Sequence, residues 1–254
     1  MYKIQRKLFS QNFLHSRKLV SQLIGKSSIG KNDLVIEIGP GKGILTEQLI
    51  EHAGHIFGVE IDAQWCTYLH EKFRDVQNFT LYQADMLSWQ LPAYPYKVFA
   101  NIPFSIEGKI IRKLIDDVHP PQDCYLVVMK ELAYRLCGQG GENMFLLMHK
   151  PWFDFSIIYH FRPTDFEPVP NVDAVLFRFT LKKVPLLPIA EKDRYMRFIM
   201  TGFGNGESVY KNLVKKYGRE KIEKAFQMVS LHRKVRPNSL MLKDWIILYT
   251  MFTQ

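Results

Sequence analysis

Four consecutive residues, Asn101, Ile102, Pro103 and Phe104, offer unusual chemistry after the apolar run at 98–100. The Asn101 side chain carries both a carbonyl acceptor and an amide donor. Pro103 fixes its own φ and keeps Ile102 out of the helical region. An acceptor beside the aromatic face of Phe104 suits a flat base with an exocyclic amine. The same residues also fit an ordinary proline turn with an inward-packed aromatic ring, so other motifs must decide.

A glycine-rich turn lies upstream of this tetrapeptide. Residues 34–38 are apolar and β-branched, Gly39, Gly41 and Gly43 follow, and apolar residues recur at helical spacing from Ile44 onward. This order predicts a strand, a tight turn and a helix. Glycines are needed where the backbone bends sharply or a ligand approaches it closely.

Two residues distinguish this turn from a dinucleotide site, which uses a similar glycine pattern. Pro40 stands inside the turn and removes a backbone donor that a pyrophosphate would use. Glu37 precedes the turn, where a carboxylate repels phosphate and attracts a cationic ligand. The two features therefore point away from a dinucleotide, and Glu37 is expected to order the glycine turn or a water.

Polar side chains recur where the following strands end. These strands are predicted at 55–62, 79–85 and 96–100, with Asp62, Asp85 and Asn101 at or just after their ends. Open α/β sheets bind ligands at the carboxyl ends of their strands, and an acid after the second strand accepts ribose hydroxyls. Surface loops also carry acids, but four successive strand ends with polar groups favour a site.

Together the motifs resemble those of S-adenosylmethionine-dependent methyltransferases that act on amines. They are Glu37-Ile38-Gly39-Pro40-Gly41-Lys42-Gly43, Val59-Glu60-Ile61-Asp62, Ala84-Asp85 and Asn101-Ile102-Pro103-Phe104. Ser10-Gln11-Asn12-Phe13-Leu14 is similar to the entry segment of the ribosomal RNA adenine methyltransferases, and residues 166–174 resemble the Pro-rich loop and following strand of that family. The resemblance covers roughly residues 3 to 250 in order and spacing.

The resemblance implies S-adenosylmethionine as cofactor and no metal. Gly39 and Gly41 are expected against its methionine and ribose part, Glu60 at the ribose hydroxyls, and Asp85 at the adenine amine. The other cofactor-binding residues that it implies are Gln11, Asn12, Leu14, Ile61, Met86 and Asn101.

The implied reaction is methyl transfer to the exocyclic N6 amine of an adenine in ribosomal RNA. That amine is a poor nucleophile because its lone pair is shared with the ring. The Asn101 side-chain carbonyl and the Ile102 backbone carbonyl are expected to draw the amine toward tetrahedral geometry, so catalysis is mostly positioning. Phe104 is expected to stack on the flipped base, after the turn that Pro103 stiffens. By resemblance, Phe13 covers its other face.

Two branches of the family compete. The Asn-Ile-Pro form, the Ser-Gln-Asn-Phe entry and the short C-terminal domain look closer to the 23S rRNA methyltransferases (Erm) that confer macrolide-type resistance. The alternative is a small-subunit (16S) rRNA adenine dimethyltransferase (KsgA) of ribosome maturation. Intact Glu60, Asp85 and Asn101 argue against a binding-only relative of the transcription-factor type. A nucleotide-dependent oxidoreductase is the remaining alternative.

Charge is segregated along the 254 residues, whose net charge is +9. Residues 1–31 hold seven Lys or Arg and no acid, 32–181 hold twelve basic and nineteen acidic side chains, and 182–254 hold fifteen basic and six acidic ones. Basic ends favour binding to the phosphates of ribosomal RNA over a merely solvated surface. The predicted contacts are Lys3, Arg6, Lys7, Lys215, Lys216 and Arg219.

The pattern of elements predicts an α/β fold, a Rossmann-like class I methyltransferase with a mostly parallel seven-stranded sheet. Further strands are expected at 124–129, 153–161 and 174–181, and C-terminal helices at 193–201, 207–216, 219–226 and 240–252. The predicted domains are 1–31, a basic arm with a helix at 17–25; 32–183, the cofactor-binding catalytic domain; and 184–254, a small helical, basic RNA-binding domain.

The composition of the chain limits the classes of protein to which it can belong. Hydrophobic residues make up 47% of the chain, enough for a packed core, and no apolar run is long enough to span a membrane. Cys66, Cys124 and Cys137 form no close-spaced pair, which fits reduced thiols without a zinc site or a disulfide framework. The start of the chain lacks a signal-peptide pattern. We expect a cytoplasmic protein, monomeric and not bound to membranes.

Overall fold

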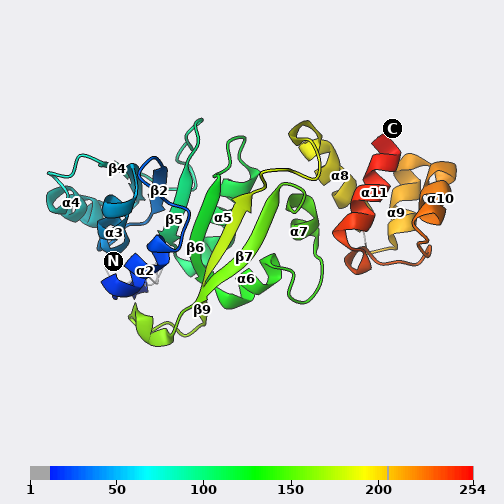
Figure 1. Ribbon diagram of the computed structural model, residues 1–254. Helices are drawn as coiled ribbons and strands as arrows, with labels where there is room; N and C mark the ends of the chain where they lie inside the picture. Colours follow the sequence, from blue (N-terminus) through cyan, green and yellow to red (C-terminus); the bar gives the residue numbers. More distant parts are fainter. Residues whose placement is uncertain (1–11, 205, 254) are drawn as a thin grey trace. The chain divides into compact units, whose positions relative to one another are not determined.

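The computed structural model describes residues 12–204 and 206–253 (Figure 1). The chain packs as two compact units. Of the described residues, 12–133 and 155–181 form the first unit, and 134–154, 182–204 and 206–253 form the second. Residues 134–154 thus pack with the C-terminal helices, although they interrupt the first unit in the sequence.

The first unit is built on a mostly parallel seven-stranded sheet, as the sequence predicted. Its strand order is β4-β3-β2-β5-β6-β9-β7. Its strands are β2 (Leu34–Ile38), β3 (His55–Glu60), β4 (Phe79–Gln83), β5 (Lys97–Asn101), β6 (Asp123–Met129), β7 (Phe153–His160) and β9 (Ala174–Leu181). Strands β4, β3, β2, β5 and β6 pair in parallel, and β9 pairs antiparallel with β6. The central strands are buried along most of their length, since helices cover the sheet.

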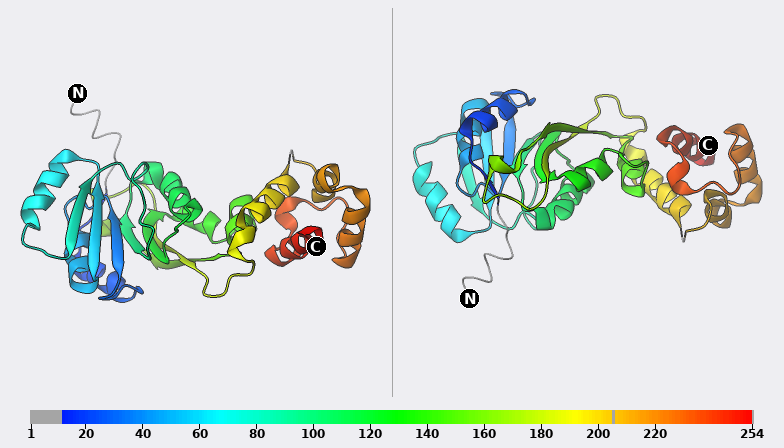
Figure 2. Two further views of the ribbon diagram at one scale, coloured as in Figure 1. Left: turned by 90° about the horizontal axis from the view of Figure 1, so that it is seen from above. Right: turned by 90° about the horizontal axis from the view of Figure 1, so that it is seen from below.

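Helices alternate with these strands: α2 (Arg17–Gly25), α3 (Ile44–His52), α4 (Ala63–Lys72), α5 (Glu107–Asp116) and α6 (Lys130–Leu136). The two views of Figure 2 show α2 and α3 on one face of the sheet and α5 on the other. The Ser16 hydroxyl caps α2 by accepting from the Leu19 amide. Val20 and Ile24 of this helix are fully buried, so its apolar stripe faces the core.

A short ribbon was not predicted. Strand β1 (Phe13–Leu14) pairs antiparallel with β8 (Phe166–Glu167), so Phe13 lies opposite Glu167 and Leu14 opposite Phe166. The His15 side chain extends this contact with a hydrogen bond of 2.7 Å to the Thr164 carbonyl. The ribbon therefore fixes the start of the described chain against a loop far along the sequence.

The second unit contains α7 (Met144–His149), α8 (Lys192–Phe203), α9 (Val209–Tyr217), α10 (Arg219–Met228) and α11 (Leu242–Thr253). Aromatic side chains fill its core, among them the fully buried Trp245. A Cβ atom added at Gly202 of α8 would lie 2.4 Å from the Trp245 ring, so glycine permits this close packing. Helix α9 begins at Val209, two residues later than predicted, because Ser208 caps it through the Lys211 amide. In the described chain, no helix is long and apolar enough to cross a membrane.

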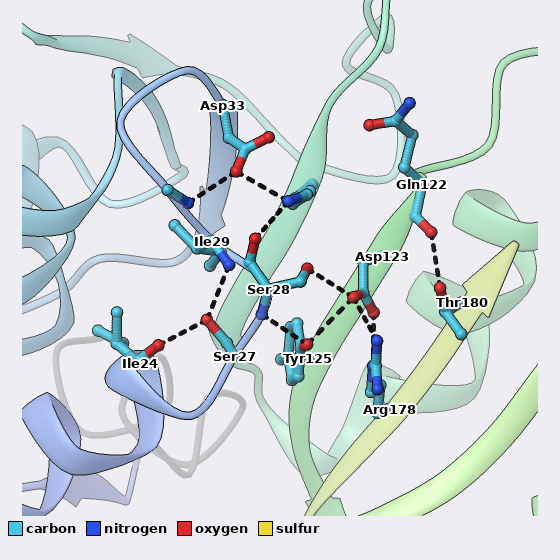
Figure 3. A network of polar contacts seen from close by, with 12 residues as sticks. Ile24, Ser27, Ser28, Ile29, Asp33, Gln122, Asp123, Tyr125, Arg178 and Thr180 are labelled. Atoms are coloured by element: carbon cyan, nitrogen blue, oxygen red, sulfur yellow. Dashed lines mark hydrogen bonds and ion pairs between the residues drawn. The ribbon is translucent and has the colours of Figure 1, made fainter.

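A buried carboxylate at the amino ends of the strands joins the sheet to the segment after α2 (Figure 3). Asp123 is 3% exposed. It accepts two hydrogen bonds from the Arg178 guanidinium, at 2.7 and 2.8 Å, and further ones from the hydroxyls of Ser28 and Tyr125. Burying this charge is tolerable because it is paired and fully hydrogen-bonded.

We expect Arg178→Met to lower the free energy of unfolding by about 3 kcal/mol, because Asp123 would remain buried without its counter-charge. Urea denaturation measures the change. The control is Arg74→Met, which removes an exposed pair with Asp75 and should cost less than about 1 kcal/mol. Equal effects of the two substitutions would contradict the argument.

Candidate active site

The glycine turn after β2 leaves open space for a ligand. Gly39, Gly41 and Gly43 all have positive φ, at 65°, 53° and 76°. Nothing lies within 4 Å of a Cβ atom built on Gly39, whereas one on Gly41 would lie 2.6 Å from the Phe13 ring. Glycine is therefore required at Gly41 both by the backbone conformation and by this close approach. The open side of Gly39 is where a ligand can reach the backbone.

Glu60 holds the end of β3 against this turn. The residue is 1% exposed, and its two carboxylate oxygens accept from the amides of Gly41, at 3.1 Å, and Asp62, at 3.0 Å. Burial raises the pKa of the Glu60 carboxyl, while these backbone hydrogen bonds oppose the rise. The carboxylate thus fixes the turn and keeps further lone pairs for another donor.

Glu37, at the end of β2, is completely buried. Neither of its carboxylate oxygens makes a hydrogen bond of ordinary geometry with the residues that the structure describes. Desolvation raises the pKa of Glu37 to about 8; the Thr46 side chain opposes the rise, and the Glu60 carboxylate adds to it. A positive charge brought near this carboxyl would favour its ionised form.

The residues after β4 lie beside these acids in the strand order. Asp85 is exposed, and one of its carboxylate oxygens accepts from the Leu87 amide at 2.9 Å. Met86 is buried, and Ile61, after β3, is 48% exposed. These three residues supply an acid and two apolar side chains at the carboxyl edge of the sheet, a suitable surface for an adenine ring with its amine.

Asn101 ends β5, where it lies opposite Val127 of β6. Its side-chain amide donates to the Asn12 carbonyl at 2.7 Å. This hydrogen bond orients the amide group, so Oδ1 is left as an acceptor without a partner among the described residues. Ile102 is 2% exposed, and Pro103 has a φ of −61°. The half-buried Phe104 then begins a 3-10 turn, Phe104–Ile106.

Phe13, beside Asn12, is half-buried and lies against the glycine turn. The ammonium of Lys42 stands 5.0 Å from the centre of its ring. The entry segment therefore contacts two motifs at once: Asn12 bonds the tetrapeptide, and Phe13 packs on the turn. The structure places Phe13 in the wall of the site, and its contact with the target base stays a prediction.

These segments enclose one pocket in the first unit, with an empty volume of about 590 Å³ including its open mouth. It is lined by Asn12, Phe13, Leu14, Gly39, Pro40, Lys42, Ile44, Leu45, Asn101, Ile102, Pro103 and Phe104. Among the described residues, no group of three or more His, Cys, Asp or Glu side chains could hold a metal ion. The pocket thus joins the predicted cofactor turn and the predicted tetrapeptide.

Comparison with known proteins identifies the family. The family model for ribosomal RNA adenine dimethylases matches residues 3–253. The chain belongs to this family. It is therefore an rRNA adenine N6-methyltransferase that depends on S-adenosylmethionine, as the resemblance predicted.

The relatives and solved structures agree on this family and differ in substrate. The chain is 30% identical to the ribosomal RNA small subunit methyltransferase A of Acaryochloris marina, covering 96% of this chain and 95% of the relative, and 31% identical to that of Fusobacterium nucleatum, covering 97% of each. The crystal structure of the 23S rRNA methyltransferase ErmE superimposes with a TM-score of 0.81 at 26% identity, covering 96% of this chain and 100% of that one. A dimethyladenosine transferase from Plasmodium falciparum shares the fold, with a TM-score of 0.79 at 20% identity, covering 95% of this chain and 97% of that one.

The pocket, together with three acids outside its lining, fits the cofactor that the family uses. S-adenosylmethionine is cationic at its sulfonium and ammonium groups. The buried Glu37 carboxyl lacks an ordinary hydrogen bond in the described chain, and a positive charge near it would favour its ionised form. Gly39 leaves its backbone open to a ligand. Glu60 and Asp85 are placed at the ends of β3 and β4, where ribose and adenine groups are expected.

The structure brings most of the predicted residues together. Those that line one pocket are Asn12, Phe13, Leu14, Gly39, Asn101, Ile102, Pro103 and Phe104. Lys215 and Lys216 lie on α9 and Arg219 begins α10, all in the second unit. Gln11, Lys3, Arg6 and Lys7 lie outside the described residues. Lining residues that were not predicted are Pro40, Lys42, Ile44 and Leu45; their position within or next to the glycine motif was the available signal.

The buried acid Glu37 should make stability depend on pH. Burial raises the pKa of this carboxyl from its ordinary value of 4.5 to about 8, so the unfolded state binds fewer protons than the folded state between these pH values. The stability of the wild type should therefore fall with rising pH relative to Glu37→Gln, by at most about 1.4 kcal/mol per pH unit. Denaturation of both proteins between pH 5 and 8 measures the difference.

The matched control is Glu51→Gln, which changes an exposed acid on α3. Its stability should run parallel to that of the wild type over the same range. Parallel curves for wild type and Glu37→Gln would mean that Glu37 is not protonated in the folded enzyme at neutral pH.

Proposed function

We propose that this enzyme methylates the N6 amine of an adenine in 23S rRNA and thereby confers macrolide-type antibiotic resistance. The observation that carries the proposal is the Asn-Ile-Pro form of the tetrapeptide in this pocket, together with the Ser-Gln-Asn-Phe entry and the short helical C-terminal segment. The likeness to the ErmE structure over its full length supports it.

A second candidate function is dimethylation of adenines in small-subunit (16S) rRNA during ribosome maturation. It is favoured by relatives at 28–31% identity that are small-subunit methyltransferases. Both functions use the same chemistry at the same pocket. The two differ in which ribosomal RNA the enzyme binds, and the catalytic residues do not distinguish them.

In the proposed mechanism, the tetrapeptide activates the adenine N6 amine, which is a weak nucleophile. Asn101 Oδ1 and the Ile102 carbonyl accept hydrogen bonds from the adenine N6 amine, which localises its lone pair on nitrogen. The Asn12 carbonyl holds the other end of the Asn101 amide at 2.7 Å, so Oδ1 keeps one orientation. The bound cofactor supplies the electrophilic methyl group. The amine nitrogen would take this methyl group as the bond from methyl to the cofactor's sulfur breaks, and its proton would pass to solvent.

The target adenine must leave its stack to reach this pocket, because its N6 is otherwise paired or stacked. Phe104 offers an aromatic face for the flipped base, and Pro103 stiffens the turn that carries it. Gly39, Glu60 and Asp85 would hold the cofactor. Most of the rate enhancement then comes from positioning two reactants.

Cations of the helical unit are proposed as phosphate contacts. Lys215 forms an ion pair of 2.9 Å with Glu207, and both side chains are substantially exposed. The ammonium of Lys216 lies 5.6 Å from the centre of the Tyr217 ring. An exposed pair is weak, so an RNA phosphate can compete with Glu207 for Lys215. Arg219 follows in the first turn of α10.

We expect Asn101→Ala to lower kcat about 10²- to 10³-fold, since it removes the acceptor that activates the amine. Single-turnover methylation measures the rate. RNA should bind with an affinity near that of the wild type, as measured by anisotropy. A rate close to that of the wild type would exclude Asn101 from the mechanism.

Reversing the charge of Lys215, Lys216 and Arg219 together should weaken RNA binding and reduce the slope of log K against log[salt] by about 2 to 3. The control is the triple change of the same residues to Gln, which should give a smaller loss of affinity. An unchanged salt slope would show that these cations do not touch the RNA.

The proposed function is tested by transfer of labelled methyl groups to protein-free 23S rRNA, with small ribosomal subunits assayed in parallel. We expect label in the 23S rRNA as N6-methylated adenine, and reduced macrolide sensitivity of cells that express the enzyme. Label confined to the small subunits would establish the maturation function instead. Absence of label from both would favour a binding-only relative.

A further inference from the structure

Two aromatic side chains stand on the outer face of α4. Trp65 and Tyr68 are three residues apart and therefore share one helix face. Their ring centres are 5.8 Å apart, with the planes at 79°. Tyr68 is 44% exposed, and Trp65 is half-buried. The helix packs on the core through other residues, Cys66 and Leu69.

This aromatic pair is continuous with the pocket through Phe13. The rings of Phe13 and Trp65 meet edge to face, with centres 5.8 Å apart. Phe13 also lines the pocket that holds Asn101 and Phe104. An aromatic surface therefore leads from the place of the target base outward along α4.

Two lysines flank these rings. Lys42 stands over Phe13 at 5.0 Å, and Lys72 stands over Tyr68 at 5.4 Å. Lys72 is engaged with Glu47 at 2.7 Å. Lys42 is exposed and, within the described parts of the chain, has no acidic partner. A cation at the pocket mouth suits an anionic ligand better than the cationic cofactor.

Exposed aromatic rings beside lysines are a chemistry that binds unpaired nucleotides. Every base has a π-face, so stacking tolerates any sequence, and the cation contacts the backbone phosphate. Packing alone does not require Trp65 or Tyr68, because the buried stripe of α4 is complete without them.

We propose that Trp65 and Tyr68 form a second base site, which stacks an unpaired RNA base flanking the target adenine while Lys42 contacts the adjoining phosphate. This site rests on the proposed activity toward RNA and deepens it. Through this site the first unit would bind the RNA next to the flipped nucleotide. This contact does not involve the cations of the helical unit. The target adenine at Phe104 and the flanking base at Trp65 then leave the RNA stack together.

The test measures binding of short single-stranded RNAs with one central adenine, in versions where each neighbouring nucleotide in turn is abasic. Fluorescence anisotropy gives the affinity in the presence of S-adenosylhomocysteine.

For the wild type, one abasic position should weaken binding about 5- to 150-fold. The Trp65→Leu/Tyr68→Leu double variant should bind intact RNA more weakly by a similar factor and be indifferent to that abasic position. Tyr94→Leu, which removes an exposed aromatic ring in the same unit, should behave as the wild type.

Several results would overturn the proposal: a wild type indifferent to every abasic position, a double variant as sensitive as the wild type, or the same loss in Tyr94→Leu. Weaker binding of S-adenosylhomocysteine by the double variant in calorimetry, with RNA binding unchanged, would assign the rings to the cofactor instead. The short RNAs do not depend on whether the enzyme acts on 23S or 16S rRNA. Failure of this site is therefore distinguishable from failure of the proposed substrate.

Discussion

The parallel pairing of five strands is the constraint on which the site depends. Parallel strands end at one edge of a sheet, so the residue after each strand meets its neighbours there. Glu60 lies opposite Gln83 and Asn101 opposite Val127 at this edge. The glycine turn, the acids and the tetrapeptide are far apart in sequence, and only this register brings them to one pocket. A shift by one residue in any pair would turn the polar group to the other face.

The acids of the site are buried, whereas a lysine of the site is exposed. Glu37 and Glu60 lie buried beneath the glycine turn, and only Glu60 has its oxygens bonded to backbone amides. Lys42, within the turn, is exposed and lies over the Phe13 ring. The two acids are therefore shielded from solvent, whereas the cation of the turn is open to it.

The sequence predicted the elements that depend on local residue patterns. Alternating apolar runs and the three turn glycines determine the strands and the cofactor turn, and the seven-stranded sheet is confirmed. The β1–β8 ribbon was not predicted, because strands of two residues carry no periodicity and their pairing is remote. Helix α7, of six residues, is likewise too short for a repeat. The geometry of Glu60 depends on its amide partners in three dimensions, which no spacing reveals.

Because of the β1–β8 ribbon, completion of the pocket depends on how much of the chain has been translated. His15 and Thr164 lie 149 positions apart and are hydrogen-bonded, and Phe13 of the same ribbon forms the pocket wall. During synthesis the wall cannot acquire its native pairing until residue 167 has emerged from the ribosome. Such remote pairing also slows folding, since a long loop must close first. A ribosome-modifying enzyme of this design thus completes its pocket only after two thirds of its own chain has been translated.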